Sequence, residues 1–261
     1  MDKDNVFERL CGDFLPVMRK LSGGGRFSAA LGGSFGKGVT DASSDYDFRF
    51  YYDEPAGEEQ TKLATGEISA LMDLWKDRGV IIDSVWSRSS KSIDAMLDAC
   101  YNGDCAPIDV EWTIWGYCVL TDIYNQYAID DPFGMIADWK KRLEVYPKAY
   151  KEAVLKKYGS LMRYWRGDYH YRNKIKRADT MFAASLAVKL LYAVLQSVYA
   201  LNEFYYPGDG YNLRYTLGFK LRPDDLETRA EAILYPGESA AACERQYENI
   251  LSLIDDTLKL M

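Results

Sequence analysis

A glycine-rich turn precedes two aspartates that alternate along one short segment, and this arrangement constrains the fold more than any other feature. The turn reads Gly32-Gly33-Ser34, and after ten intervening residues come Asp45 and Asp47. Residues 45–52 are rich in aromatic side chains and contain no Gly or Pro, a composition typical of a β-strand. Because side chains two apart on a strand share a face, Asp45 and Asp47 are expected to point the same way.

The two halves of this segment suit the binding of a metal ion and a phosphate. Mg²⁺ takes oxygen ligands and is usually held by one or two carboxylates together with substrate phosphates. Gly32 and Gly33 permit a tight turn whose backbone N–H groups can receive phosphate oxygens, and Ser34 adds a hydroxyl donor. Each half alone is more often an ordinary turn or a solvated strand face. Together, in this order and at this spacing, the two halves are a specific signal for a site that binds a metal ion and a phosphate.

The joined pattern resembles a motif of the DNA polymerase β-like nucleotidyltransferase superfamily, which includes aminoglycoside, lincosamide and minimal nucleotidyltransferases. The family motif is an apolar residue, Gly, then Gly or Ser, followed after nine to thirteen residues by Asp, an apolar residue, and Asp or Glu. Leu31-Gly32-Gly33-Ser34 and Asp45-Tyr46-Asp47-Phe48 match it. The specific resemblance covers about 20 residues.

The family has a third carboxylate on a neighbouring strand, and residues 107–115 offer two candidates for it. Apolar and polar residues alternate there with the period of a half-buried strand. Asp109 and Glu111 both lie on the polar face and both sit between apolar residues. Glu111 is slightly favoured, although the sequence does not decide between them. An amphipathic strand with a wet acidic face is the structural alternative.

The resemblance implies a role for each of these residues. Asp45 and Asp47 would bind Mg²⁺, and Asp109 or Glu111 would complete the site by holding metal or by acting as general base. Gly32, Gly33, Ser34 and Lys37 would hold the phosphates of a nucleoside triphosphate, with ATP expected. A hydroxyl of the acceptor would attack the α-phosphorus in line, and pyrophosphate would leave with one or two metal ions assisting.

Composition excludes several other kinds of chemistry. His170 is the only histidine, so histidine-rich metal sites and a Ser-His-Asp centre are not expected. The five cysteines lack the paired spacing of a zinc site and are interpreted as reduced thiols. The charged N-terminus lacks a signal-peptide core, and we expect neither a membrane span nor membrane binding. A cytoplasmic location is therefore expected.

The pattern of elements predicts an α+β protein with two domains. Residues 1–137 are expected to form a mixed-sheet nucleotidyltransferase domain, with helices at 5–20, 60–77 and 92–101 and strands at 27–31, 45–52 and 80–86. Gly23-Gly24-Gly25 is interpreted as a connector. Residues 138–261 are expected to form a helical bundle that binds the acceptor, with long helices at 139–165 and 178–204 and others near 224–234 and 239–260.

Charge is divided unevenly between these two parts. Residues 1–137 contain 12 Lys or Arg against 23 Asp or Glu, whereas residues 140–177 contain 13 against 3. The acidic part favours a cationic small-molecule acceptor resembling an aminoglycoside. The basic segment offers Lys151, Lys156 and Lys157 as triphosphate contacts, or a surface for nucleic acid, which is less favoured, or simply a solvated helix face.

The helical part adds a weaker resemblance. Residues 200–208 include Leu201-Asn202, Tyr205 and Pro207, and they are similar to a helix-end stretch of antibiotic nucleotidyltransferases, although the lysine common after the proline is absent. The leading hypothesis is transfer of a nucleoside monophosphate to a hydroxyl acceptor. The alternatives are adenylylation of a protein or an RNA end, and a non-catalytic nucleotide-binding protein that retains the fold. The oligomeric state cannot be read from the sequence.

Overall fold

The chain divides into two compact units in the computed structural model, which describes residues 3–41, 43–111, 113–208, 210, 212–237 and 239–261. The first unit comprises the residues up to Ala99 together with Val119–Val145, and the second comprises Cys100–Cys118 and Tyr146–Met261. The expected boundary between residues 137 and 138 falls within helix α6 (Met135–Leu143) of the first unit.

A mixed four-stranded sheet forms the centre of the first unit. Its strands are β1 (Ser22–Leu31), β2 (Tyr46–Pro55), β3 (Ile82–Ser89) and β4 (Tyr127–Asp130), in the order β3-β2-β1-β4. β1 pairs antiparallel with both β2 and β4, whereas β2 pairs parallel with β3. Helix α3 (Glu58–Asp77) supplies the crossover that parallel neighbours require. The expected α+β class is confirmed.

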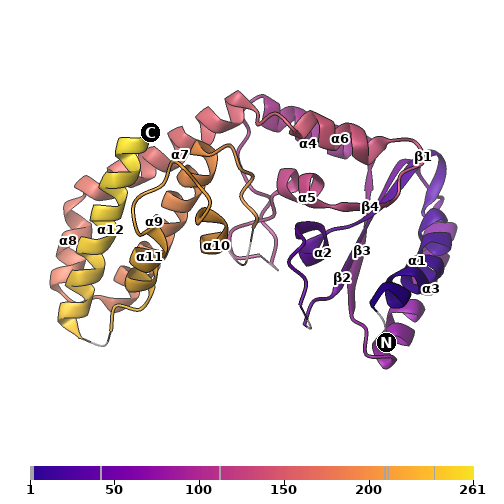
Figure 1. Cartoon of the computed structure of the whole chain (residues 1–261), viewed down its shortest axis with the longest axis horizontal. Coiled ribbons are helices and arrows are strands. Elements are labelled where there is room, and N and C mark those ends of the chain that lie inside the picture. Colours follow the sequence, from indigo (N-terminus) through magenta and orange to yellow (C-terminus); the bar gives the residue numbers. More distant parts are fainter. Residues whose placement is uncertain (1–2, 42, 112, 209, 211, 238) are drawn as a thin grey trace. The chain divides into compact units, whose positions relative to one another are not determined.

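The two faces of β2 have different partners. Phe48 and Phe50 are fully buried in a core that also includes residues of α1 (Lys3–Arg19) and α3, and Figure 1 shows these two helices beside the sheet. On the opposite face, Arg49 pairs with Asp122 and Tyr51 packs edge-on against Trp139. Asp122 and Trp139 belong to α5 (Val119–Asn125) and α6. The period-two pattern therefore separates an apolar face from the face that carries Asp47.

Two further helices complete the first unit. The short helix α2 (Gly33–Lys37) follows β1 directly, and α4 (Ser90–Tyr101) follows β3. The expected elements at 5–20, 27–31, 45–52, 60–77, 80–86 and 92–101 all correspond to described ones. The connector expected at Gly23-Gly24-Gly25 is wrong, because these glycines form the irregular start of β1. Gly23 packs directly against the backbone of Pro55, where a side chain would not fit.

The second unit is helical in all its described elements. They are α7 (Lys148–Gly167), α8 (Tyr169–Lys176), α9 (Thr180–Leu201), α10 (Asn212–Thr216), α11 (Leu226–Leu234) and α12 (Ala240–Leu260). The long α9 packs against both α7 and α12 (Figure 1). The single helix expected over 139–165 is instead two, α6 and α7, because Pro147 lacks the N–H that a continuous helix needs.

The strand expected over residues 108–114 is wrong. Its described residues make only an isolated bridge between Ile108 and Tyr117, and Trp112 lies outside the described residues. The segment belongs to the helical unit, in which the described residues offer no sheet edge to pair with. Gly116, at φ +83°, reverses the chain against Pro107. Alternating apolar and polar residues therefore occur here in a loop.

Helix α9 is long and apolar enough to cross a membrane by length and composition alone, contrary to the expectation that no such stretch exists. Most of its apolar window, 61%, is buried inside the structure. The core helix of a soluble bundle meets the same criteria, and the packing of α9 against α7 and α12 matches that description.

The stacking of α1 on β2 gives a test of the first unit's core. Phe14 is fully buried, and its ring stacks on that of Phe48 with centroids 4.9 Å apart. Phe14→Ala is expected to lower the free energy of unfolding by about 3–5 kcal/mol, measured by urea denaturation. Leu63→Ala, at an exposed position of α3, is the control and should change it little. A loss below about 1 kcal/mol for Phe14→Ala would contradict this packing.

Candidate active site

The glycine turn lies directly against the aspartate strand. Gly32 N–H donates a hydrogen bond to the carbonyl of Asp47 (2.9 Å). A Cβ added at Gly33 would fall 1.9 Å from Oδ2 of Asp47, and Gly33 adopts φ +54°. A glycine is therefore required at position 33 both by the left-handed backbone and by the carboxylate that occupies the space of a side chain.

A buried ion pair packs directly against the same turn. The Arg49 guanidinium bonds both carboxylate oxygens of Asp122, with Nε–Oδ2 at 2.9 Å and Nη2–Oδ1 at 3.3 Å. Both side chains are only 9% exposed. A Cβ at Gly32 would come within 2.8 Å of Nη2 of Arg49 and of Oδ1 of Asp122. Gly32 thus makes room for this pair.

Arg49 also connects the two parallel strands. Its guanidinium lies over the ring of Trp86 on β3, 5.1 Å from the centroid, and its Nη1 lies 3.7 Å from Oδ1 of Asp47. Arg49 and Trp86 are register partners on β2 and β3. The guanidinium is therefore shared between an ion pair, an aromatic face and a longer contact with Asp47.

Asp83 is a third carboxylate near Asp47, and it was not among the candidates taken from the sequence. It lies on β3, where the register shifts between the Tyr46–Ile82 and Asp47–Ser84 pairs, so that Asp83 is the extra residue. Such bulges re-aim side chains and are common beside active sites. Asp83 is exposed, and its charge acts on Asp47. The apolar residues before it, Ile81-Ile82, were a signal that could have identified it.

The electrostatic setting of Asp47 is unfavourable to its charge. Burial raises the pKa of Asp47 from 3.8 to about 6. The Arg49 guanidinium opposes that rise, while the carboxylates of Asp45, Asp83 and Asp122 add to it. Negative charge therefore exceeds the single buried positive charge at this end of β2. A bound divalent cation would relieve this excess.

The donor set fits Mg²⁺ bound together with a phosphate ligand. Among the described residues, no three acidic, histidine or cysteine side chains converge closely enough to form a complete metal cage. Mg²⁺ commonly takes one or two carboxylates and completes its coordination with water and substrate phosphates. Asp45 and Asp47, with Asp83 on the adjacent strand, offer oxygen ligands of this kind.

The turn itself contributes polar groups. The hydroxyl of Ser34 is buried and has no hydrogen-bond partner among the residues that the structure describes. Lys37 is the last residue of α2, one turn after Ser34. An unpaired hydroxyl next to clustered carboxylates is consistent with a ligand that supplies the missing acceptor, because buried polar groups are normally paired.

Five sequence-predicted residues lie in the second unit: Asp109, Glu111, Lys151, Lys156 and Lys157. Asp109 and Glu111 are exposed on the 108–117 loop, and the structure does not place them on a strand beside β2. Lys151 forms an ion pair with Glu203, 2.7 Å apart. Asp45, Asp47, Gly32, Gly33, Ser34 and Lys37 all belong to the first unit, where the structure brings the turn against Asp47 and the charge of Asp45 acts on Asp47.

Comparison with known proteins gives limited information. Residues 117–211 match the family described as Domain of unknown function (DUF4037). This match covers α5, β4, α6, α7, α8 and α9 and so includes Asp122. No curated protein matches the chain.

The close approach of Gly33 to Asp47 can be tested with two glycine variants. Gly33→Ala is expected to displace the Asp47 carboxylate and to lower the free energy of unfolding by more than backbone strain alone would, measured by urea denaturation. Gly38 has a similar φ of +67°, but a Cβ there would meet no described atom within 4 Å. Gly38→Ala therefore controls for backbone strain of about 1–3 kcal/mol. Equal losses of unfolding free energy in the two variants would contradict a close contact between Gly33 and the Asp47 carboxylate.

The buried charge of Asp47 predicts how stability depends on pH. Because the pKa of Asp47 is higher in the folded than in the unfolded state, the folded state binds the proton more tightly. The free-energy cost of ionising the buried carboxylate therefore grows as the pH rises from 3.8 to about 6, and it is fully present above that pH. Without metal, Asp47→Asn should therefore raise the free energy of unfolding at pH 7.5 by on the order of 2 kcal/mol, and by much less at pH 4.

Chemical denaturation at both pH values measures this difference. Asp73→Asn, at an exposed position on α3, controls for the change in net charge. A destabilising effect of Asp47→Asn at pH 7.5 would show that the carboxylate is stabilised where it lies.

Proposed function

We propose that the protein is a Mg²⁺-dependent nucleotidyltransferase that transfers a nucleoside monophosphate, with ATP as the expected donor, to a hydroxyl of a small molecule. The observation that carries this proposal is the contact between the Asp47 carboxylate and the Gly32-Gly33 turn. Asp45 and Asp83 add negative charge at the same point. The groups that we propose for binding phosphate and metal thus belong to one compact unit.

Each residue has a defined task in this proposal. Asp45 and Asp47 hold Mg²⁺, which when bound neutralises phosphate charge and polarises the phosphorus under attack. The backbone N–H groups of Gly33 and Ser34, with the Ser34 hydroxyl, receive phosphate oxygens. Lys37 adds a positive charge for the same phosphates. Arg49 and Asp122 hold the turn and the strand in register and do not touch the nucleotide.

Asp83 is assigned to the third acidic position in place of Asp109 or Glu111. It is on the strand adjacent to β2, and its charge acts on Asp47 within one unit. Being exposed, it can accept the proton that the acceptor hydroxyl loses as it attacks. Asp109 and Glu111 remain the alternatives, and variants can distinguish them.

A cavity in the helical unit supports a small-molecule acceptor. It has a volume of about 350 Å³, within the range typical of ligand sites. Trp115 stacks on Tyr192 at 4.2 Å, and Leu191, Leu195 and Arg214 also line the cavity. No acidic residue is among the described ones that line it, so this cavity suits a planar, largely apolar acceptor better than an aminoglycoside-like polycation.

Adenylylation of an RNA end is a second candidate, favoured by the surface of α7. Lys156, Lys157 and Arg163 are exposed there beside the exposed Tyr164. Within the described part of the chain, Lys156 and Arg163 form no ion pair. RNA affinity that falls steeply with salt would support this candidate, and a flat response would argue against it.

The third acidic position gives the sharpest test of the proposal. Asp83→Asn is expected to reduce pyrophosphate release from ATP and Mg²⁺ by about 10²–10⁴-fold, because it removes the proton acceptor while keeping the shape. The release would be followed over a panel of aromatic alcohols, aminoglycosides and short RNAs. Asp109→Asn and Glu111→Gln serve as matched controls and should change the rate only a few-fold.

A larger loss of activity in Asp109→Asn or Glu111→Gln than in Asp83→Asn would assign the third carboxylate to the 108–117 loop. If none of the acceptors supports release in the wild-type protein, Mg²⁺-dependent binding of a fluorescent ATP analogue decides whether a nucleotide site exists. Absence of that binding would contradict the proposed function.

A further inference from the structure

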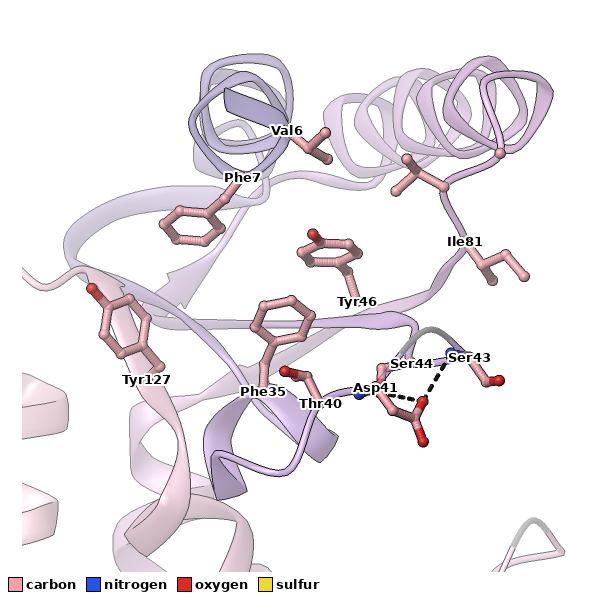
Figure 2. A pocket seen from close by; sticks show the side chains of 12 residues that line it. Val6, Phe7, Phe35, Thr40, Asp41, Ser43, Ser44, Tyr46, Ile81 and Tyr127 are labelled. Carbon is pink, nitrogen blue, oxygen red and sulfur yellow. Dashed lines mark hydrogen bonds between the residues drawn. The ribbon is translucent and has the colours of Figure 1, made fainter. Parts of the chain in front are cut away.

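Another cavity belongs to the first unit and is lined by segments that neighbour the candidate active site. It has a volume of about 600 Å³. Figure 2 shows the residues that line it, which come from the start of α1, the helix α2, the loop after α2, the beginning of β2, the turn before β3 and Tyr127 of β4. Tyr46 points into it from β2, and the next residue of this strand, Asp47, has its side chain on the other face.

The walls are aromatic on one side and hydroxyl-bearing on the other. Phe35 stacks on Tyr46 with centroids 4.4 Å apart, and Phe7 meets Tyr127 edge-on at 6.1 Å. Thr40, Ser43 and Ser44 supply hydroxyls on the side of the loop. Stacked and edge-on rings of this kind favour a planar aromatic ligand.

The charge of the lining determines what can enter. Asp41 is the one charged residue among the described lining residues, and its Oδ1 accepts hydrogen bonds from the Ser43 N–H (2.8 Å) and the Ser44 hydroxyl (3.3 Å). No Lys or Arg is found in that same set. A phosphate or carboxylate would find no positive partner there, whereas a hydroxyl or amino group would find oxygen acceptors.

The cavity touches the segment next to each part of the active site. Phe35 directly follows Ser34 of the glycine turn, Ser44 and Tyr46 flank Asp45, and Ile81 lies two residues before Asp83. A ligand packed among these side chains would contact the backbone segments that carry the phosphate donors and the carboxylates. Binding at the two sites is then linked, since each ligand favours its own arrangement of the same segments.

We propose that this cavity is an effector site for an uncharged aromatic molecule bearing a hydroxyl or amino group, and that its occupancy changes the affinity of the neighbouring site for Mg²⁺-ATP. The first part of this proposal depends only on the cavity. The second part rests on the proposed function. The phosphates of a nucleotide would bind outside this cavity, because its described lining lacks the cations that a triphosphate would need.

The first part is tested by the binding of 2-naphthol, an uncharged aromatic alcohol, followed by saturation-transfer NMR and calorimetry. Naphthalene-2-sulfonate, which has the same rings and a negative charge, is the matched probe and should bind at least tenfold more weakly. Equal or tighter binding of the sulfonate, or no binding of 2-naphthol, would overturn the assignment.

Cavity-filling variants locate the binding. Thr40→Trp and Val80→Trp introduce an indole from two different walls and should each weaken 2-naphthol binding at least tenfold. Thr40 is exposed, so its variant can fold even if Val80→Trp does not. Leu63→Trp, on the exposed surface of α3, should bind as the wild type does. Unchanged affinity in Thr40→Trp would place the naphthol elsewhere and overturn the site.

The second part is tested by titrating Mg²⁺-ATP with and without saturating 2-naphthol. A shift of at least threefold in ATP affinity, matched by the same factor in naphthol affinity when ATP is present, is expected from linkage. If neither ligand changes the affinity of the other, the coupling is overturned, but the assignment of the cavity as a binding site stands. Absence of ATP binding under all conditions would overturn the proposed function and the coupling together, while the naphthol result would still decide the cavity.

Discussion

The contact between the glycine turn and the acidic strand is the constraint on which the rest of the first unit depends. The Asp47 carboxylate occupies the space that a side chain at Gly33 would need, and the Arg49–Asp122 pair does the same at Gly32. These contacts require the end of β1 to lie beside the beginning of β2, and they require α5 to return to the sheet so that Asp122 can pair with Arg49 next to the turn. The candidate active site is thus part of the packing of the sheet.

This packing makes the ionised form of Asp47 unfavourable. Asp47 is largely buried beside three other carboxylates, and Arg49 already forms its close ion pair with Asp122. A buried ion pair contributes little net stability by itself, although loss of one partner is strongly destabilising. The arrangement is therefore poorly explained by stability alone. It becomes understandable if a divalent cation and a phosphate complete it, since functional sites often retain such unfavourable charges.

Much of the first unit could be predicted from the sequence because its signals are local. The aromatic run of β2 and the Gly32-Gly33-Ser34 turn are short-range patterns, and the structure brings them together. The proposed third acid was harder to predict, because both Asp83 and Glu111 follow apolar residues. Only strand pairing separates them. Asp83 is on a strand parallel to β2, whereas residues 108–117 belong to a unit without a described sheet edge.

Other features depend on contacts far apart in the chain. β4 is four residues long and pairs with β1, which lies about 100 residues earlier in the chain. No local sequence pattern therefore predicts this strand. The role of Arg49 could not be read from its neighbours, because Asp122 lies 73 residues away. The long helices α9 and α12 were predictable from their apolar periodicity, but the cavity beside α9 depends on Trp115 from the loop. The proposed acceptor site is consequently the part that was least predictable from the sequence.

The central claim is that Asp45 and Asp47 hold a divalent cation only together with a nucleotide. Electron paramagnetic resonance of Mn²⁺, titrated into the protein with a non-hydrolysable ATP analogue, measures this directly. We predict tight Mn²⁺ binding that requires the analogue in the wild-type protein and is lost in the folded Asp45→Asn, Asp47→Asn double variant. Retention of nucleotide-dependent Mn²⁺ binding by that double variant would contradict the claim.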